Sequence, residues 1–249
     1  MLRIMSLNVN YYVDRHGPWS ARRELIAETI RSTRPDIIAL QAVRKDPGHY
    51  RGVDQATQLA NLVPDYKYVQ FEPATRTSGG GAEGSAVLSH LPFAANDTLP
   101  LSLVPNLDDK NRRLIIRAQF DLRFLTFNLF NAHFSWVEEQ AESNVKEALP
   151  FIDSPENPSL LVGDLNQPPD SPAMQRFAAE GWTDVWAALC PGQDGYTFET
   201  GNLTKRIDYA WANLACKPRL EAIDIVGPGP SGPDISDHLG LLITLDLSI

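Results

Sequence analysis

Cysteine is scarce in this chain, with 2 residues among 249. Cys190 and Cys216 are too few for a disulfide framework, and they lack the paired spacing of a metal site. We therefore interpret both as structural side chains. Structural thiols without disulfides are typical of a reducing compartment, so the expected location is cytoplasmic.

Long apolar runs are also absent, and the N-terminus has no basic segment followed by an apolar one. The sequence therefore predicts no membrane span and no signal peptide. Positive charge is in deficit, because the formal net charge is −9. This deficit argues against broad attraction to a polyanion, which depends on Lys and Arg neutralising phosphates. It is compatible with a small basic patch and with carboxylates that bind a divalent metal.

The composition, with 43% hydrophobic and 21% charged residues, is that of a globular protein. The length and the lack of repeats or linkers favour a single domain over residues 1–249. Apolar runs predict strands at residues 2–9, 36–40, 66–71, 85–89, 113–120, 122–132, 159–162, 206–212 and 239–247. Helices are predicted at residues 21–33, 54–62, 138–152 and 172–180. Some neighbouring strands are joined too tightly for a parallel crossover, so we expect two mixed sheets packed face to face with helices outside.

Polar side chains of the types that bind metals or phosphates lie at the ends of several predicted strands, or within one. The set is Asn8, His133, Asp164, Asn166, Asp208, Asp237 and His238. Each alone has an ordinary explanation, such as a turn former, a hydrogen-bonded interior histidine or an acid paired with a nearby base. Their repetition at strand ends favours a common site, because strand ends in α/β proteins are where functional groups gather.

The motifs resemble those of the endonuclease/exonuclease/phosphatase superfamily, and the resemblance covers essentially the whole chain. Gly163-Asp164-Leu165-Asn166 matches the family's G-D-x-N, and Ser236-Asp237-His238 matches its terminal motif. Residues 84–89, followed by Pro92, are similar to the family's central segment. The resemblance implies a DNase I-like, two-sheet α/β sandwich with outer helices and an active site at one edge. It also implies hydrolysis of phosphoesters with Mg²⁺, or with Mn²⁺ as the alternative metal.

The resemblance further implies roles for the matched acids and imidazoles. Asp208 and His238 match an Asp–His pair, in which the carboxylate orients an imidazole that is a general base or a phosphate contact. Asp164 matches the acid that orients or deprotonates the attacking water. His133 matches a DNase-like histidine that contacts phosphate or acts as a general acid.

Amides, one acid and one arginine complete the implied site. Asn8 and Asn166 would donate to phosphate, while Asn8 and Asp237 would contribute to metal binding. Arg113 resembles an arginine that braces the metal-binding acid and would also face the substrate. The competing arginines are Arg112 and Arg117, and surface charge is the ordinary explanation for all three.

One position departs from the family's pattern. Its L-Q-E segment, whose Glu is a principal Mg²⁺ ligand, corresponds here to Leu40-Gln41-Ala42. A methyl group cannot bind a metal, and neither Asp46 nor Asp36 obviously replaces the missing carboxylate. The chain is therefore a natural pseudoenzyme or an active enzyme in which the ligand was replaced, and the retention of every other site residue favours the second. In both cases we expect severely impaired hydrolysis.

The expected substrate is a phosphodiester in a nucleic acid, a nucleotide or a headgroup. A nucleic acid would require basic and aromatic side chains beside the site. The candidates are Arg76, in a glycine-rich loop predicted over residues 75–84, and Trp136, which follows shortly after His133. Further basic candidates are Arg112, Arg113, Lys205 and Arg206. The alternative is a phosphate-binding module without hydrolytic activity, and no obligate protein partner is evident.

Overall fold

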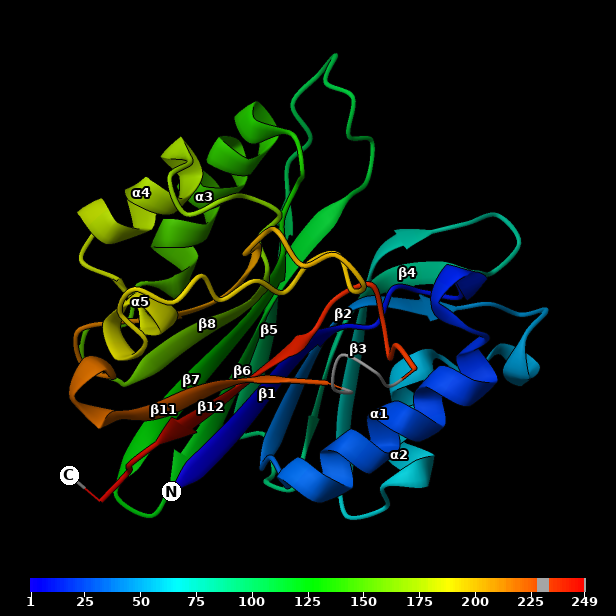
Figure 1. The fold of residues 1–249 in the computed structure, drawn as a ribbon, viewed down its shortest axis with the longest axis horizontal. Coiled ribbons are helices and arrows are strands. Elements are labelled where there is room, and N and C mark those ends of the chain that lie inside the picture. Colours follow the sequence, from blue (N-terminus) through cyan, green and yellow to red (C-terminus); the bar gives the residue numbers. More distant parts are fainter. Residues whose placement is uncertain (228–232, 249) are drawn as a thin grey trace.

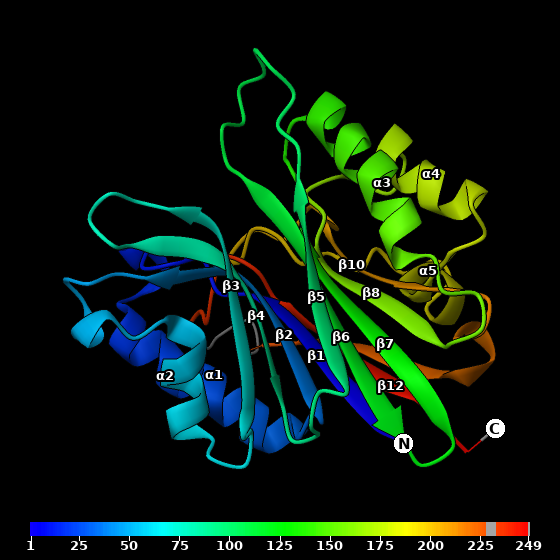
Figure 2. The same cartoon turned by 180° about the vertical axis from the view of Figure 1, so that it is seen from behind.

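Two sheets packed face to face form the centre of the computed structural model (Figures 1 and 2). The structure describes residues 1–227 and 233–248, and within them each sheet has six strands. The first has the order β11 (Leu220–Val226), β12 (Gly240–Leu245), β1 (Leu2–Asn8), β2 (Ile37–Lys45), β4 (Ala82–Ser89) and β3 (Tyr68–Arg76). The second has the order β5 (Ala95–Leu101), β6 (Arg113–Leu122), β7 (Leu125–His133), β8 (Ser159–Asp164), β10 (Asp208–Ala212) and β9 (Thr183–Asp184).

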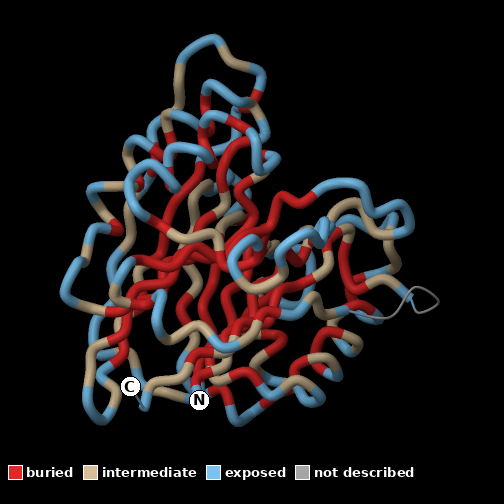
Figure 3. Tube along the Cα trace, turned by 60° about the vertical axis from the view of Figure 1, so that its left-hand side comes forward, coloured by how far each residue is buried: buried red, intermediate tan, exposed pale blue. Residues whose placement is uncertain are grey.

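Helices cover the outer faces of both sheets, as Figure 1 shows. On the first sheet lie α1 (Trp19–Thr33) and α2 (Gln55–Leu62); beside the second lie α3 (Glu138–Ile152), α4 (Pro172–Ala179) and the short α5 (Val185–Leu189). Short 3₁₀ turns occur at Asp14–His16, Tyr50–Gly52 and Lys217–Arg219. Buried apolar side chains form three layers, one between the sheets, one under α1 and α2, and one under α3 and α4. In Figure 3 the residues coloured as buried run through the interior. Among the described helices, none is long and apolar enough to cross a membrane.

The predicted mixed topology is confirmed. β1 and β2 run parallel, as do β7 and β8, whereas the other pairs are antiparallel. Three described strands escaped prediction, β5, β9 and β11, and each lies at the edge of its sheet. Edge strands are half solvated, β5 carries a proline and β9 has only two residues, so none of them has a continuous apolar run. The loop expected over residues 75–84 is shorter, because β3 and β4 extend into it as a hairpin.

Strand β2 also exceeds its prediction, which ended it at Leu40. The strand continues to Lys45 through a bulge, where its pairing with β4 shifts between Leu40 and Val43. Ala42 lies in this bulge with a left-handed φ of 52°. A bulge leaves a residue outside the ladder and changes the direction of its side chain. Ala42 is therefore a structurally special position within the strand, rather than the first residue of a loop.

Arg22 on α1 fixes the chain that leaves β1. Its guanidinium donates to the carbonyl oxygens of Val9 and Ile235 at 2.7 and 3.3 Å, and of Tyr11 and Gly17 at 2.8 and 3.1 Å. The residue is 1% exposed, so these carbonyls would lose their donor in a shielded environment if the side chain were removed. One arginine thus holds together the segments that follow Asn8 and precede Ser236.

We expect Arg22→Met to lower the free energy of unfolding by about 2–3 kcal/mol, because several buried carbonyls would lose their partner. Urea denaturation followed by tryptophan fluorescence measures this change. Arg23→Met is the matched control, since Arg23 forms a surface ion pair with Glu24, and it should change the value by less than about 1 kcal/mol. Equal losses in both variants would contradict the anchoring role of Arg22.

Candidate active site

Strand register brings four of the predicted site residues together. Asp164 at the end of β8 lies opposite His133 of β7 and opposite Asp208 of β10. From the other sheet, Asn8 donates from its Nδ2 to Asp164 Oδ2 at 2.8 Å. The cluster therefore lies at the edge where the two sheets meet, as the sequence led us to expect.

His238 completes this cluster through the segment before β12. Its Nδ1 lies 2.9 Å from Asp208 Oδ2, and its Nε2 lies 3.6 Å from Asp164 Oδ2. Asp208 Oδ2 also accepts a hydrogen bond from Thr197 Oγ1 at 2.6 Å. Burial lowers the pKa of His238, but Asp208 and Asp164 more than offset this effect and raise it to about 10. The imidazole is accordingly protonated at neutral pH.

Two further groups of the cluster, Asp164 and His133, have pKa values that are shifted in opposite directions. Burial raises the pKa of Asp164 to about 6, although His238 beside it acts in the other direction. Burial, with the positive charges of Arg113 and His238, holds the pKa of His133 well below its usual value. Near pH 7 the site thus contains a carboxylate, an imidazolium and a neutral imidazole within a few ångströms.

The G-D-x-N motif has a backbone explanation. Gly163 has a φ of 142°, and a Cβ at this position would lie 1.9 Å from the carbonyl oxygen of Ala132. Asn166 adopts a left-handed φ of 56°, and its backbone N–H donates to Asp164 Oδ1 at 3.0 Å. One side-chain N–H of Asn166 is held by the Phe134 carbonyl at 3.0 Å. Glycine permits close approach of β7 and β8, and the turn orients the Asp164 carboxylate.

Ala42 is buried beside the same sheet edge, at 2% exposure. Its carbonyl accepts from the backbone N–H of Tyr11 at 2.9 Å, which ties the bulge to the chain following Asn8. Tyr11 reaches the site as well, because it lines a small pocket with His133, Arg113 and Glu83. Position 42 therefore belongs to the site region, and its side chain offers only a methyl group.

The donor set for a divalent metal can be compared with the side chains present. Asp164, Asp208 and His238 place potential ligand atoms within 4.8 Å of one another. The hydrogen bond between His238 Nδ1 and Asp208 Oδ2 occupies two of these atoms, so this group suits proton handling. The oxygens of Asn8 and Asp237 are hard donors of the kind that Mg²⁺ prefers. The set fits such an ion in chemical type but has no carboxylate at position 42.

A model of the Endonuclease/Exonuclease/phosphatase family matches residues 5–238. The chain belongs to the endonuclease/exonuclease/phosphatase family. No curated protein matches the sequence. The family match spans every predicted catalytic and metal-site position, from Asn8 to His238.

Solved structures share the fold of the family. The family protein from Leptotrichia buccalis C-1013-b is 18% identical, with a TM-score of 0.82 over 99% of this chain and 100% of its own. The family protein from Beutenbergia cavernae DSM 12333 is 25% identical, with a TM-score of 0.77 over 98% of this chain and 71% of its own. A mannosyl-6-phosphatase from Bacteroides thetaiotaomicron VPI-5482 is 16% identical, with a TM-score of 0.76 over 99% of this chain and 100% of its own. The two-sheet DNase I-like fold expected from the motifs is thereby confirmed.

Some of the remaining residues predicted from the family pattern lie at the cluster, and others do not contact it. Arg113 is buried at the site edge and donates to Asp109 Oδ2 at 3.0 Å. Of the two competing arginines, Arg117 pairs with Asp97 on β5, away from the small pocket that Tyr11 and His133 line, whereas Arg112 lines that pocket. Asp237 lies at the site with its Oδ1 3.9 Å from His238 Nε2. Arg76 and Trp136 are exposed and form no hydrogen bond with the cluster among the described residues.

Sequence reasoning missed two neighbours of the Asp–His pair. Thr197 holds the Asp208 carboxylate, and the Phe198 ring lies 4.8 Å from the His238 ring between centroids. Both come from a long irregular segment with no pattern of its own. Their only signal is position in space, since backbone bridging places Phe198 beside Lys205 and His238.

We expect Asp208→Asn to lower the pKa of His238 strongly, because it removes the nearest negative charge. Imidazole ¹H–¹³C NMR at about pH 8 should show a charged ring in the parent chain and a neutral ring in the variant. Thr197→Val is the matched control, as it removes a hydrogen bond to Asp208 while keeping the charge. Because the pKa of His238 is higher in the folded state than in the unfolded state, protonation of this ring stabilises the fold at pH values below the unfolded-state pKa. This contribution to stability is lost as pH rises through about 10. Identical titration curves would refute the pairing.

Proposed function

We propose that this chain carries the site of a Mg²⁺-dependent phosphoesterase, with Mn²⁺ as an alternative, and that Ala42 impairs hydrolysis. The observation that carries the proposal is the position of Asp164 between His133, Asp208–His238 and Asn8 at the sheet edge. A carboxylate able to accept a proton beside an imidazolium suits attack by water on a phosphate ester. We further propose that residues 1–249 form a single domain and that the protein is cytoplasmic.

The chemistry divides among the residues by charge. Asp164 is ionised near pH 7 and takes the proton from the attacking water. His238 is already protonated, so its role is to stabilise negative charge on a phosphoryl oxygen rather than to act as the base. Asp208 fixes the His238 ring through Nδ1. Neutral His133 and the amides of Asn8 and Asn166 donate hydrogen bonds to the phosphate.

The metal would be held by oxygen atoms of Asn8 and Asp237, and by a carboxylate at position 42 if one were present. When bound, such an ion supplies positive charge to the phosphoryl oxygens and the leaving oxygen. The loss of a carboxylate that would bind the ion directly is expected to weaken metal binding by more than the roughly 10–100-fold typical of residues that only orient the ligands. This is the physical reason for proposing that the chain is impaired.

The substrate class proposed is a phosphodiester or phosphomonoester of a small alcohol. The net charge of −9 favours a small ester over a polyanion such as nucleic acid. The likeness to a mannosyl-6-phosphatase is compatible with a monoester substrate. If nucleic acid is bound, Arg76 and Trp136 are the side chains proposed to contact it.

A second candidate is a natural pseudoenzyme or phosphate-binding module. The observation in its favour is that Ala42 is fully accommodated in its bulge, with its carbonyl bonded to Tyr11. The decisive experiment compares Mg²⁺-dependent hydrolysis by the parent chain and by Ala42→Glu on model phosphoesters. Turnover by the second protein supports the enzyme, and its absence in a folded Ala42→Glu protein supports the module.

A further inference from the structure

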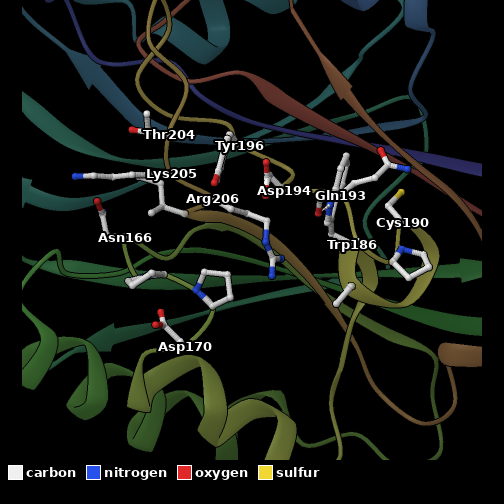
Figure 4. A pocket seen from close by; sticks show the side chains of 16 residues that line it. Asn166, Asp170, Trp186, Cys190, Gln193, Asp194, Tyr196, Thr204, Lys205 and Arg206 are labelled. Atoms are coloured by element: carbon white, nitrogen blue, oxygen red, sulfur yellow. Dashed lines mark hydrogen bonds between the residues drawn. The ribbon is translucent and has the colours of Figure 1, made fainter.

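A cleft of about 810 Å³ is lined by Asn166 and extends from it toward Trp186 and Cys190 (Figure 4). Its walls come from the residues after β8, the segment around α5 and the residues before β10. Asn166 belongs both to this cleft and to the turn that orients Asp164. A phosphate ester held at Asp164 would therefore have its alcohol part beside this cleft.

The end of the cleft beside Asn166 includes a lysine. Lys205 lines it, is exposed and forms no ion pair with any residue in the described ranges. Its Nζ lies 5.9 Å from the centroid of the Phe198 ring, and that ring packs against His238. Arg206 also lines the cleft, but its guanidinium is held by both oxygens of Asp184 at 3.1 and 2.8 Å. Among the described residues that line this end, Lys205 is thus the cation free to bind one phosphate.

The far end is mainly apolar. Trp186 directs its indole N–H to the Gln193 carbonyl at 3.0 Å, which fixes the ring as part of the wall. Ala187 and Pro191 add apolar surface at this end, and Pro168 and Pro169 add it nearer to Asn166. The volume lies within the roughly 300–1,000 Å³ typical of small-molecule sites. Such walls suit the face of a ring.

Two carboxylates also line the cleft. Asp170 lies toward Asn166 and Asp194 lies toward Gln193 and Trp186, as Figure 4 shows. Both side chains are exposed. Their negative charge repels a second phosphate, and their oxygens accept hydrogen bonds from hydroxyl groups. The cleft is therefore built for one phosphate at one end and for an uncharged group beyond it.

We propose that this cleft binds the uncharged, ring-bearing alcohol part of a phosphate ester whose phosphate lies at the Asn166 end. This proposal rests on the proposed function, which it narrows to esters of a small ring-bearing alcohol. Lys205 contacts the phosphate, and the ring lies against Trp186 and Ala187. The specificity of the site then resides in segments that contribute nothing to proton transfer.

Binding by the intact chain tests the proposal without requiring turnover. Isothermal titration in Mg²⁺ buffer compares 1-naphthyl phosphate, methyl phosphate, inorganic phosphate and 1-naphthol. Ala187→Phe fills the apolar end, whereas Ala188→Phe adds the same ring one residue along α5, outside the cleft. Both alanines are exposed, so neither change disturbs the core.

The parent chain should bind 1-naphthyl phosphate about 10-fold more tightly than methyl phosphate. Ala187→Phe should abolish this preference and leave methyl phosphate unaffected, while Ala188→Phe should keep it. Equal affinity for both esters, or equal behaviour of both variants, would overturn the cleft proposal while leaving the phosphate site intact. Binding of 1-naphthol that depends on Ala187, without binding of any phosphate, would instead refute the proposed function and retain an apolar subsite.

Discussion

Ala42→Glu is expected to raise Mg²⁺-dependent hydrolysis of bis-p-nitrophenyl phosphate by at least about 100-fold over the parent chain. The substitution supplies the carboxylate that the oxygen donors around Asn8 and Asp237 lack. Ala42, which itself has a Cβ, already adopts a left-handed φ of 52°, so the substitution exchanges one non-glycine residue for another on this backbone. Release of p-nitrophenolate measures turnover, and plasmid DNA, RNA and inositol phosphates then locate the substrate class.

The matched control is Ala42→Gln, which has nearly the same volume but no charge. It should remain close to the parent chain, since an amide is a weaker ligand for Mg²⁺ than a carboxylate. Melting curves of all three proteins establish that each is folded. If folded Ala42→Glu hydrolyses none of these esters, the chain is a binding module rather than an enzyme.

Asp164→Asn in the Ala42→Glu background should lower the rate by about 10³-fold, because the amide cannot accept the proton of the attacking water. Asp164 is also predicted to shape the pH profile. Burial raises its pKa to about 6, and a base must be deprotonated, so activity should fall as pH drops through that value. A pH–rate series on both proteins measures the two effects together.

Asp153→Asn is the corresponding control, because Asp153 is an exposed acid at the end of α3. It should leave both the rate and the acidic limb unchanged. If Asp164→Asn retains the rate of its background, or if the acidic limb survives in it, Asp164 is not the base. His238 would then have to be deprotonated during the reaction, against the influence of Asp208 and Asp164.

The predicted site could be recognised from the sequence because its chemistry follows strand ends. β7 and β8 are buried apolar strands, and pairing alone places His133, Asp164 and Asp208 opposite one another. The glycine of the G-D-x-N motif likewise has a local cause, since only glycine fits against Ala132. Long apolar strands and close backbone contacts leave a direct record in the residue pattern.

Other features could not be predicted because they depend on distant segments meeting. The bulge at Ala42 arises from pairing between β2 and β4, and nothing in Leu40-Gln41-Ala42 signals a left-handed residue. The cleft is assembled from three separate segments, of which only Asn166, Lys205 and Arg206 stood out in the sequence. Exposed loop residues carry no periodicity, so their grouping appears only in three dimensions.

The order of strands in the first sheet determines when this sheet can be completed during synthesis of the chain. β1 is synthesised long before its neighbour β12, so this edge of β1 remains unpaired while the segments between them are made. The same late segment brings Asp237 and His238 to Asp164 and Asp208, which precede it in the chain. Closure of the sheet and assembly of the charged pair are therefore a single event. A partly synthesised chain would hold the carboxylates without their imidazolium, and would remain both inert and prone to edge pairing until that strand docks.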